Sequence, residues 1–494
     1  MSFKKTLLAL TAIGAIAGTA VPAMALENEF HGMYKMKYFV SNIDNASSGN
    51  VFKSGTTTSA MNYFEQRARL FYNAKANDDL KLVVAFEIDS VFGDKSQGTL
   101  SSATATSLNT TAFRNSGGAL DTDAVNLETK WVHLDFNIPG VPTNVKVGTQ
   151  AIKDSLKGVL FDVDAAGIYT STKLGSNAKV NLGYFRGYEG DAGATGGIKM
   201  GVNNLDLVIL EGKYNVTKDI AVGANYYGMF DYRDNFATML DHTLGVNADA
   251  TFGAVNVSGF IAGQLGVISN RSGVTSVASG SLNATGQAID LSAIAANVTA
   301  RVKVGPGTAK VAGLYTSGDD GRDANKNKAW QSLQMTTNGV NTIASAGTGS
   351  LNTYNDSGMM LLNRNAAAQG TTTDRQLAST TNNNNQGMIL LSAGYDANIT
   401  PKAYASVNAG VLWAAENRTL SLNDQITSNA NGAVKPVKGR SNLMGAELNV
   451  ETGYKLYDNL TASVQGAYVV LGNYYNGTGM KDPYTARAVL SYAF

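Results

Sequence analysis

The sequence predicts an all-β protein, a transmembrane antiparallel up-and-down β-barrel of about 18 strands, with 16 strands as the alternative. Segments of the ~9–11 residues that a membrane strand needs alternate between apolar and polar positions along the chain. Connections of one to five residues alternate with longer polar ones. The chain also ends on an alternating stretch whose final residue is aromatic. Alternation alone is equally typical of a soluble β-sheet, so the other two observations decide for the barrel.

The last stretch, residues 483–494, has the sequence PYTARAVLSYAF. Tyr492 and Phe494 share one face with the apolar residues before them, because side chains alternate along a strand. Arg487 lies on the opposite, less apolar face. A soluble edge strand has little reason to end on an exposed phenylalanine, so this stretch favours a strand in a membrane.

The first residues predict a secretory signal peptide over residues 1–25. Lys4 and Lys5 precede an apolar core, and Ala23-Met24-Ala25 is a cleavage site of the small-x-small type. No cysteine follows the cleavage point, so a lipoprotein anchor is not expected. Residues 26–494 would then form the barrel, in a protein exported through the inner membrane to the outer membrane.

Composition excludes several classes of function. The chain has no cysteine, three scattered histidines and a formal net charge of +1, so we expect no disulfide, no metal site and no nucleic-acid partner. No catalytic set of nucleophile, histidine and acid stands out, and no cofactor is expected. A Gly-rich, Tyr-rich and Pro-poor chain fits a polar-lined barrel with aromatic girdles.

The alternating segments give the expected strands. They are 27–40, 61–76, 80–89, 125–138, 144–152, 166–174, 178–188, 204–216, 220–232, 240–252, 254–268, 288–304, 308–316, 387–399, 402–415, 441–456, 460–472 and 483–494. Gln66 falls on the face that would meet lipid, and a β-bulge would remove this conflict.

The connection lengths assign the two ends of the barrel. Every second connection is short, so we expect periplasmic turns at one end, where both chain ends also lie, and long extracellular loops at the other. Residues 317–386 form the longest of these loops. Its Asn-rich composition offers little apolar area, so we expect a mobile surface loop.

The chain resembles the Gram-negative outer-membrane porins. The resemblance rests on the signal peptide, on the terminal AVLSYAF and on pieces beside turns such as residues 211–228 and 454–469. Residues 146–150, KVGTQ, look like the strand before the porin constriction loop, whereas the Pro-Glu-Phe-Gly motif of enterobacterial porins is absent. The resemblance implies that the barrel-assembly machinery reads Tyr492 and Phe494, and that homotrimers in outer-membrane lipid are among the expected assemblies.

Charge patterning supplies the candidate pore residues. Lipid-facing charges cost ~2–4 kcal/mol at mid-depth, so the basic residues of the first, second and last strands are expected to face the lumen. They are Lys35, Lys37, Arg67, Arg69 and Arg487. Glu65, Glu87 and Asp89 would neutralise part of this row.

A second candidate is residues 153–165, which mix apolar residues with three acids and are too apolar for a solvated loop. We expect a segment folded into the lumen, presenting Asp154, Asp162 and Asp164 as constriction acids; a loop over the barrel rim is the alternative.

These observations favour a diffusion porin, which passes small hydrophilic solutes and ions and has no enzyme activity. A substrate-specific channel, a barrel that sheathes a partner such as an electron-transfer cytochrome, and an outer-membrane hydrolase are the alternatives.

Overall fold

The computed structural model describes most of the barrel and parts of its long connections. The described residues are 27–44, 51–52, 61–93, 127–190, 203–233, 237–270, 288–323, 325–333, 354–363, 377–378, 380–383, 385–417, 441–475 and 481–494. The predicted signal peptide, residues 1–25, lies outside them.

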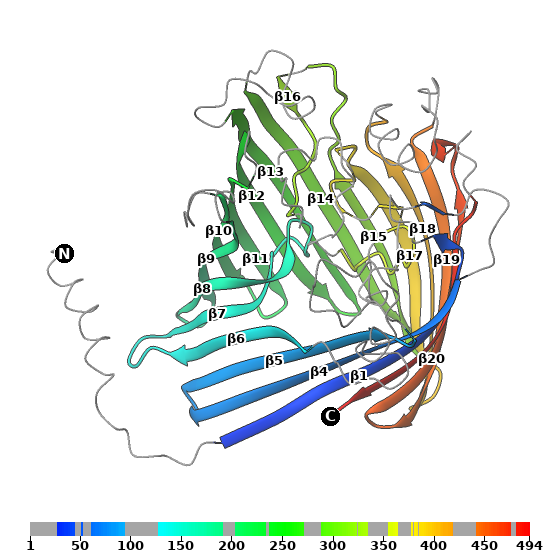
Figure 1. The fold of residues 1–494 in the computed structure, drawn as a ribbon, viewed down its shortest axis with the longest axis horizontal. Helices are drawn as coiled ribbons and strands as arrows, with labels where there is room; N and C mark the ends of the chain where they lie inside the picture. The colour runs from blue at the N-terminus through cyan, green and yellow to red at the C-terminus, as the bar shows by residue number, and fades with distance from the viewer. Residues whose placement is uncertain are drawn as a thin grey trace, which may run out of the picture.

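Eighteen antiparallel strands form one closed sheet, which confirms the predicted fold and strand number (Figure 1). They are β1 (Glu27–Ser41), β4 (Met61–Asn77), β5 (Leu80–Val91), β6 (Glu128–Asn137), β7 (Thr143–Lys153), β8 (Asp162–Leu174), β9 (Ala178–Gly190), β10 (Asn203–Asn215), β11 (Ile220–Asp231), β12 (Ala237–Phe252), β13 (Val255–Asn270), β14 (Ile289–Val304), β15 (Gly307–Thr316), β17 (Met388–Asn398), β18 (Ala403–Ala414), β19 (Leu443–Tyr457), β20 (Leu460–Leu471) and β21 (Tyr484–Ala493). The two-residue strands β2 (Ile43–Asp44), β3 (Val51–Phe52) and β16 (Lys326–Asn327) and the 3-10 helix η6 (Asn473–Tyr475) lie in connections.

Closure is made by the first and last strands. Strand β1 pairs with β4 on one side and with β21 on the other, so that Tyr34 is opposite Ala68 in one pair and Tyr492 in the other. Every strand of the ring therefore has two neighbours, and the backbone hydrogen bonds that a bilayer cannot supply are made within the sheet. Among the described residues, no helix is long and apolar enough to cross a membrane.

The connections separate by length between the two ends of the barrel. Tight turns join β4 to β5, β12 to β13 and β14 to β15, and each lies at the end where β1 begins and β21 finishes. At that end Gly32 and Phe494 exchange backbone hydrogen bonds of 2.9 and 3.1 Å. The long connections all leave from the opposite end. We call these the short-turn end and the long-loop end.

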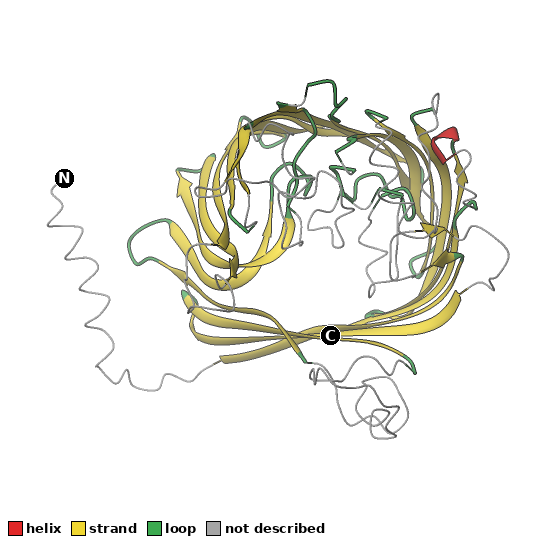
Figure 2. Ribbon diagram, turned by 45° about the horizontal axis from the view of Figure 1, so that its top comes forward, coloured by secondary structure: helices red, strands yellow, loops and turns green. Residues whose placement is uncertain are grey.

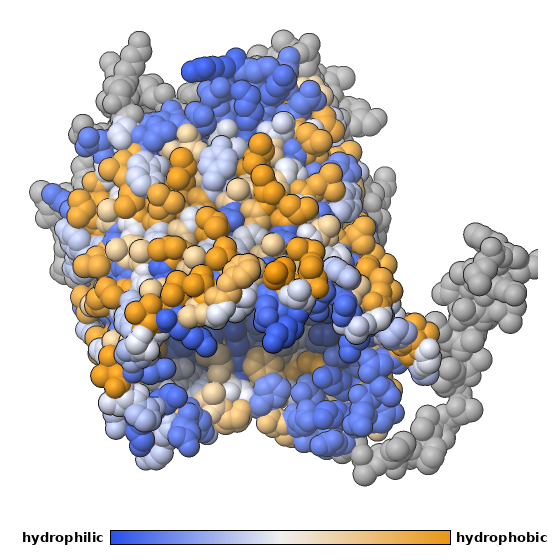
Figure 3. All heavy atoms as spheres, turned by 180° about the vertical axis from the view of Figure 1, so that it is seen from behind, coloured by the Kyte–Doolittle hydropathy of each residue, from blue (hydrophilic) through white to orange (hydrophobic). Residues whose placement is uncertain are grey.

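On each strand, the apolar side chains at alternate positions face the outside of the barrel. Large apolar side chains such as Leu182, Leu244, Leu265 and Val298 are more than half exposed, whereas the polar set of the same strands faces inward. Figure 3 shows one side of the barrel, where an apolar band crosses the wall between hydrophilic residues above and a hydrophilic hollow below. This is the surface that a strand barrel needs in lipid.

Gln66 lies on the outer face of β4, and the β-bulge that we expected at this position is absent from the β1–β4 pair. The β1–β4 register runs unbroken past it, and Met36 is its partner across the strands. Its amide accepts a hydrogen bond from Tyr34 Oη at 3.0 Å and donates one to Ser90 Oγ at 2.9 Å. Neighbouring polar side chains, rather than a change of register, therefore satisfy this amide on the outer wall.

The apolar core lies inside the ring, against the wall of β8 to β20. It contains inward residues of these strands, such as Phe185, Leu207 and Phe260, together with loop residues such as Phe161 and Trp330. Figure 2 shows the barrel tilted so that its opening faces the viewer, with loops inside the ring of strands. The lumen is thus partly filled along most of its wall.

Candidate functional site

The connection between β7 and β8 is an inward segment, residues 154–161. Its apolar side chains Leu156, Val159, Leu160 and Phe161 are almost fully buried within the barrel. Phe161 meets the ring of Tyr227, an inward residue of β11, edge to face at 5.4 Å between centroids. The segment therefore packs its apolar side on the lumen wall. We call it the first inward segment.

Asp154 folds this segment rather than lining the lumen. Its carboxylate accepts backbone hydrogen bonds from Gly158 at 2.8 Å, Leu160 at 2.8 Å and Phe161 at 2.6 Å. Burial raises the pKa of Asp154 to about 6, although the three amide donors oppose that rise. The expectation that this acid is presented to the pore does not hold.

Polar contacts fix the first inward segment to the wall. The backbone N–H of Ser155 donates to Tyr227 Oη at 2.8 Å, and its hydroxyl donates to Glu211 at 2.7 Å. On the other side, Val159 O accepts from Thr381 Oγ1 at 2.6 Å. The segment is therefore held between strands β10 and β11 and a connection more than two hundred residues away in sequence.

Asp162 and Asp164 lie elsewhere than expected, because β8 begins at Asp162. Both share the outward face of β8 with Ile168, which is 48% exposed. Asp162 pairs with Lys153 at 2.9 Å, and Asp164 pairs with Lys130 at 2.5 Å. Pairing of β6 with β7 stops at Thr149, which leaves Asp164 room to reach β6. These acids are ion-paired on the outer wall near the long-loop end and do not line the lumen.

A second inward segment, residues 354–363, comes from the long connection between β15 and β17. Met359, Leu361 and Leu362 are fully buried in it. Glu447, an inward residue of β19, accepts backbone hydrogen bonds from Met360 at 2.7 Å, Leu361 at 2.9 Å and Leu362 at 2.8 Å. One carboxylate thus holds three consecutive amides against the wall.

The prediction of a mobile surface loop for residues 317–386 is wrong for these described parts. The prediction relied on the Asn-rich average composition and overlooked scattered apolar residues such as Trp330 and Leu361, which are buried. The asparagines are buried too, because their amides bond the backbone: Asn383 Nδ2 donates to Gly387 O at 2.8 Å, and Asn385 N donates to Asn382 Oδ1 at 2.7 Å. The side-chain amides here make the hydrogen bonds with buried backbone groups that a helix or strand would otherwise provide.

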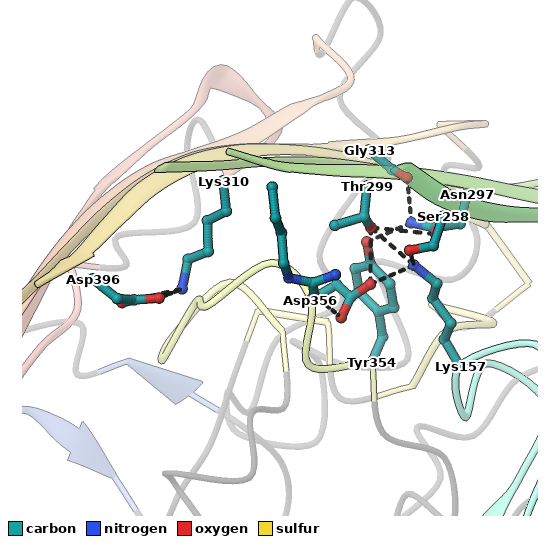
Figure 4. Close-up of polar contacts among 10 residues, drawn as sticks. Lys157, Ser258, Asn297, Thr299, Lys310, Gly313, Tyr354, Asp356 and Asp396 are labelled. Carbon is teal, nitrogen blue, oxygen red and sulfur yellow. Dashed lines mark hydrogen bonds and ion pairs between the residues drawn. The ribbon is translucent and has the colours of Figure 1, made fainter. Parts of the chain in front are cut away.

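The two inward segments meet at a cluster of charges (Figure 4). Asp356 accepts from Lys157 Nζ at 2.5 Å, from Thr299 Oγ1 at 2.8 Å and from Arg301 at 2.7 Å. Burial alone would raise the pKa of Asp356, but its hydrogen bond and charge pairing with Lys157 lower that pKa below its usual 3.8. The carboxylate therefore stays ionised and ties both segments to β14.

The structure brings the predicted basic row together on the lumen side of adjacent strands. Lys35 is opposite Arg67 in the β1–β4 pair, and Met33, two residues earlier on the same face, is opposite Arg69. Arg487 on β21 lies over the Phe39 ring at 5.1 Å, and Lys37 lies over the same ring at 5.3 Å.

Acids on the same wall neutralise part of this row. Lys37 pairs with Glu65 at 3.0 Å, Arg67 pairs with Asp89, and Arg69 pairs with Glu87. Lys35 makes no ion pair within the described part of the chain. Of the four predicted basic residues on β1 and β4, it is therefore the one without a direct acid partner among the described residues.

Tyr492 and Phe494 lie at the short-turn end of the closing strand. Their rings stack at 5.5 Å between centroids, and Phe494 is 53% exposed. A surface aromatic pair at the end of the last strand is thus available to a partner.

No protein-family model matches this chain, and no curated protein matches it. Solved structures do. The chain is similar to Pseudomonas aeruginosa OccK8 (OprE), with a TM-score of 0.51 and 13% identity over 94% of this chain and 98% of that one. It is also similar to Acinetobacter baumannii OccAB1, with a TM-score of 0.50 and 11% identity over 94% and 96%. In strand number, closure and course, this chain has the fold of the outer-membrane porins that its sequence resembles.

Proposed function

We propose that this protein is an outer-membrane porin, which passes small hydrophilic solutes and ions through a water-filled lumen without chemical conversion. The observation that carries the proposal is the combination of a closed 18-stranded ring with an apolar outer wall and a lumen narrowed by two fixed inward segments. At ~16–18 strands a barrel leaves an aqueous channel unless its interior is plugged.

A substrate-specific channel is the second candidate. The inward segments are held by buried carboxylates rather than left loose, since Asp154 and Glu447 each bind three amides. A fixed narrowing with side chains at set positions is what selection among solutes needs. A sheath around a partner protein is less well supported, because both segments occupy lumen that a sheath would leave to its partner.

The proposal includes export and assembly. Residues 1–25 direct the chain through the inner membrane, residues 26–494 form the barrel in outer-membrane lipid, and the short-turn end faces the periplasm. The assembly machinery reads Tyr492 and Phe494, and the barrels associate as homotrimers. Mass spectrometry of the mature N-terminus tests cleavage after Ala25, and native mass spectrometry in detergent tests the trimer.

A planar-bilayer recording tests the channel itself. The purified protein should insert in discrete steps and conduct potassium chloride, and liposomes that contain it should swell in small sugars more than in large ones. Folded barrel that inserts but gives neither current nor swelling would overturn the proposal.

A further inference from the structure

A cavity of about 750 Å³ lies in the lumen between the second inward segment and the short-turn end. Its wall comes from strands β14, β15, β17, β18 and β19, and its roof includes Asn355, Gly358 and Met360. The size falls within the ~300–1,000 Å³ of small-molecule sites. A solute that leaves the narrowed part of the lumen toward the short-turn end would pass this cavity.

Glycines make room for the polar side chains of the cavity. A Cβ added at Gly394 would lie 2.1 Å from Asn408 Oδ1 and 2.8 Å from Lys310 Cε. At Gly358, which has a φ of +69°, it would lie 2.9 Å from Asn408 Oδ1 and 3.1 Å from Lys310 Nζ. Strand β17 and the second inward segment thus both lack a side chain where Asn408 and Lys310 lie.

The side-chain carbonyl oxygen of Asn408 is a hydrogen-bond acceptor that no described donor reaches. Its Nδ2 donates to Ser406 Oγ at 3.1 Å and to Asn449 Oδ1 at 2.9 Å, which fixes the orientation of the amide. Its buried Oδ1 has no hydrogen-bond partner among the described residues. A buried carbonyl oxygen without a donor costs ~1–3 kcal/mol, so a solute hydroxyl that reached it would relieve that cost.

The charges of the cavity are balanced. Lys310 Nζ pairs with Asp396 at 3.1 Å, and Tyr404 Oη donates to Glu451 at 2.8 Å. Two lysines, Lys303 and Lys310, line the cavity together with two acids, Asp396 and Glu451. Figure 4 shows the Lys310–Asp396 pair beside Asp356 under the β14–β17 wall. A balanced lining gives no net attraction for an anion or a cation.

We propose that this cavity binds an uncharged polyhydroxylated solute of sugar-like chemistry. Each hydroxyl both donates and accepts, so neighbouring hydroxyls match the mixed set of acceptors on Asp396, Asn408 and Glu451 and the donors on Lys310 and Asn355. The ring of Tyr404 supplies an apolar surface for the C–H face of such a solute. The inference rests on the proposed channel function and names the solute class of one site in it.

Single-channel recordings with three probes test the inference. D-glucose at millimolar concentration should cause brief current blockades, whereas D-gluconate and glycine betaine, an anion and a zwitterion, should cause fewer. Asn408→Leu removes the acceptor at similar volume and should shorten the glucose blockades about five- to tenfold, while the potassium chloride current stays. Asn225→Leu is the matched control, because Asn225 is a buried asparagine on another part of the wall, and its blockades should equal those of the wild type.

The outcomes separate the two proposals. Normal current without glucose blockades, or blockades unchanged in Asn408→Leu, would overturn the sugar site and leave the channel standing. Longer blockades with gluconate or betaine than with glucose would also overturn it and assign the cavity to charged solutes. Loss of current in the wild type would overturn the channel.

Discussion

Lys157 and Asp356 stand 199 positions apart in the chain, yet Lys157 Nζ lies 2.5 Å from Asp356 Oδ2 (Figure 4). This pair joins the two inward segments to each other, and Arg301 joins Asp356 to the wall. The narrow part of the lumen is therefore one connected structure, and its mobility should depend on a few charges.

The first prediction removes this link. Lys157→Ala should raise the open-channel noise and the mean conductance, because Asp356 loses a charge-assisted hydrogen bond worth roughly 1.5–3 kcal/mol. Bilayer recordings measure both quantities. Lys153→Ala is the control, since its ion pair with Asp162 lies on the outer wall. Equal noise in the two variants would contradict a role for Lys157 in holding the segments.

The second prediction concerns acid. The pKa of Asp356 is below its ordinary value of 3.8. The stabilisation that the ionised carboxylate gives to the link is therefore complete above pH 3.8, and it is lost as the pH falls through the lowered pKa of the folded state. The difference in noise between wild type and Lys157→Ala should therefore persist from neutral pH to about pH 4 and disappear only in stronger acid. A difference that already disappears near pH 6 would show that another group controls this link.

The third prediction concerns Asp154, whose pKa is raised to about 6 by burial. The folded segment then binds more protons than the unfolded one between about pH 4 and 6, so its stability falls as the pH rises through that window. Hydrogen exchange at the amides of Gly158 and Leu160, corrected for intrinsic rates, should show stronger protection at pH 4.5 than at pH 6.5. Asp154→Asn should lose this dependence on pH. A wild-type protection that is flat or rises with pH would contradict it.

The fourth prediction concerns Glu447. Glu447→Ala leaves three buried amides of the second inward segment without their acceptor, so these amides should exchange faster by tenfold or more and the conductance should rise. Glu447→Gln keeps one acceptor oxygen and should lie between alanine and wild type. Glu29→Ala, which changes an acid near the short-turn end, should leave both readings unchanged.

The fifth prediction concerns the basic row. The double variant Arg67→Ala with Arg69→Ala should shift the reversal potential in a salt gradient toward cation preference, because it removes two positive charges and frees Glu87 and Asp89 from their partners. Lys35→Gln removes a charge without freeing an acid, so its shift should have the same direction and be smaller. Unchanged reversal potentials would mean that other residues set ion preference.

The sequence predicted the parts of the fold that depend on local alternation. Each strand shows its two faces within about ten residues, so the strands and the lumen position of Arg67 and Lys35 followed without tertiary information. The same rule would also have placed Asp162 and Asp164 on the outer wall if the alternation that reaches Ile168 had been extended back to residue 162.

The inward segments were harder to predict, because their partners are remote. The apolar content of residues 153–165 indicated an inward fold, but nothing local showed that Asp154 would bind the segment's own amides. In the long connection, composition concealed the apolar cluster around Leu361, and the acceptor of its amides, Glu447, is 86 positions away. The Asn408 cavity likewise combines four separate parts of the chain, 303–310, 355–360, 396–408 and Glu451.

The closing seam between β1 and β21 constrains how the barrel is made. Tyr34 is opposite Tyr492, so the first strand gains its second neighbour only after almost the whole chain has been delivered. Such distant pairing is slow, because a very large loop must be closed before its contacts stabilise it. Until then both edges of the growing sheet are open to other chains, which is a route to aggregation. Closure of this barrel must therefore wait for its last strand, and β1 and β21 must be kept from pairing with other chains until they pair with each other.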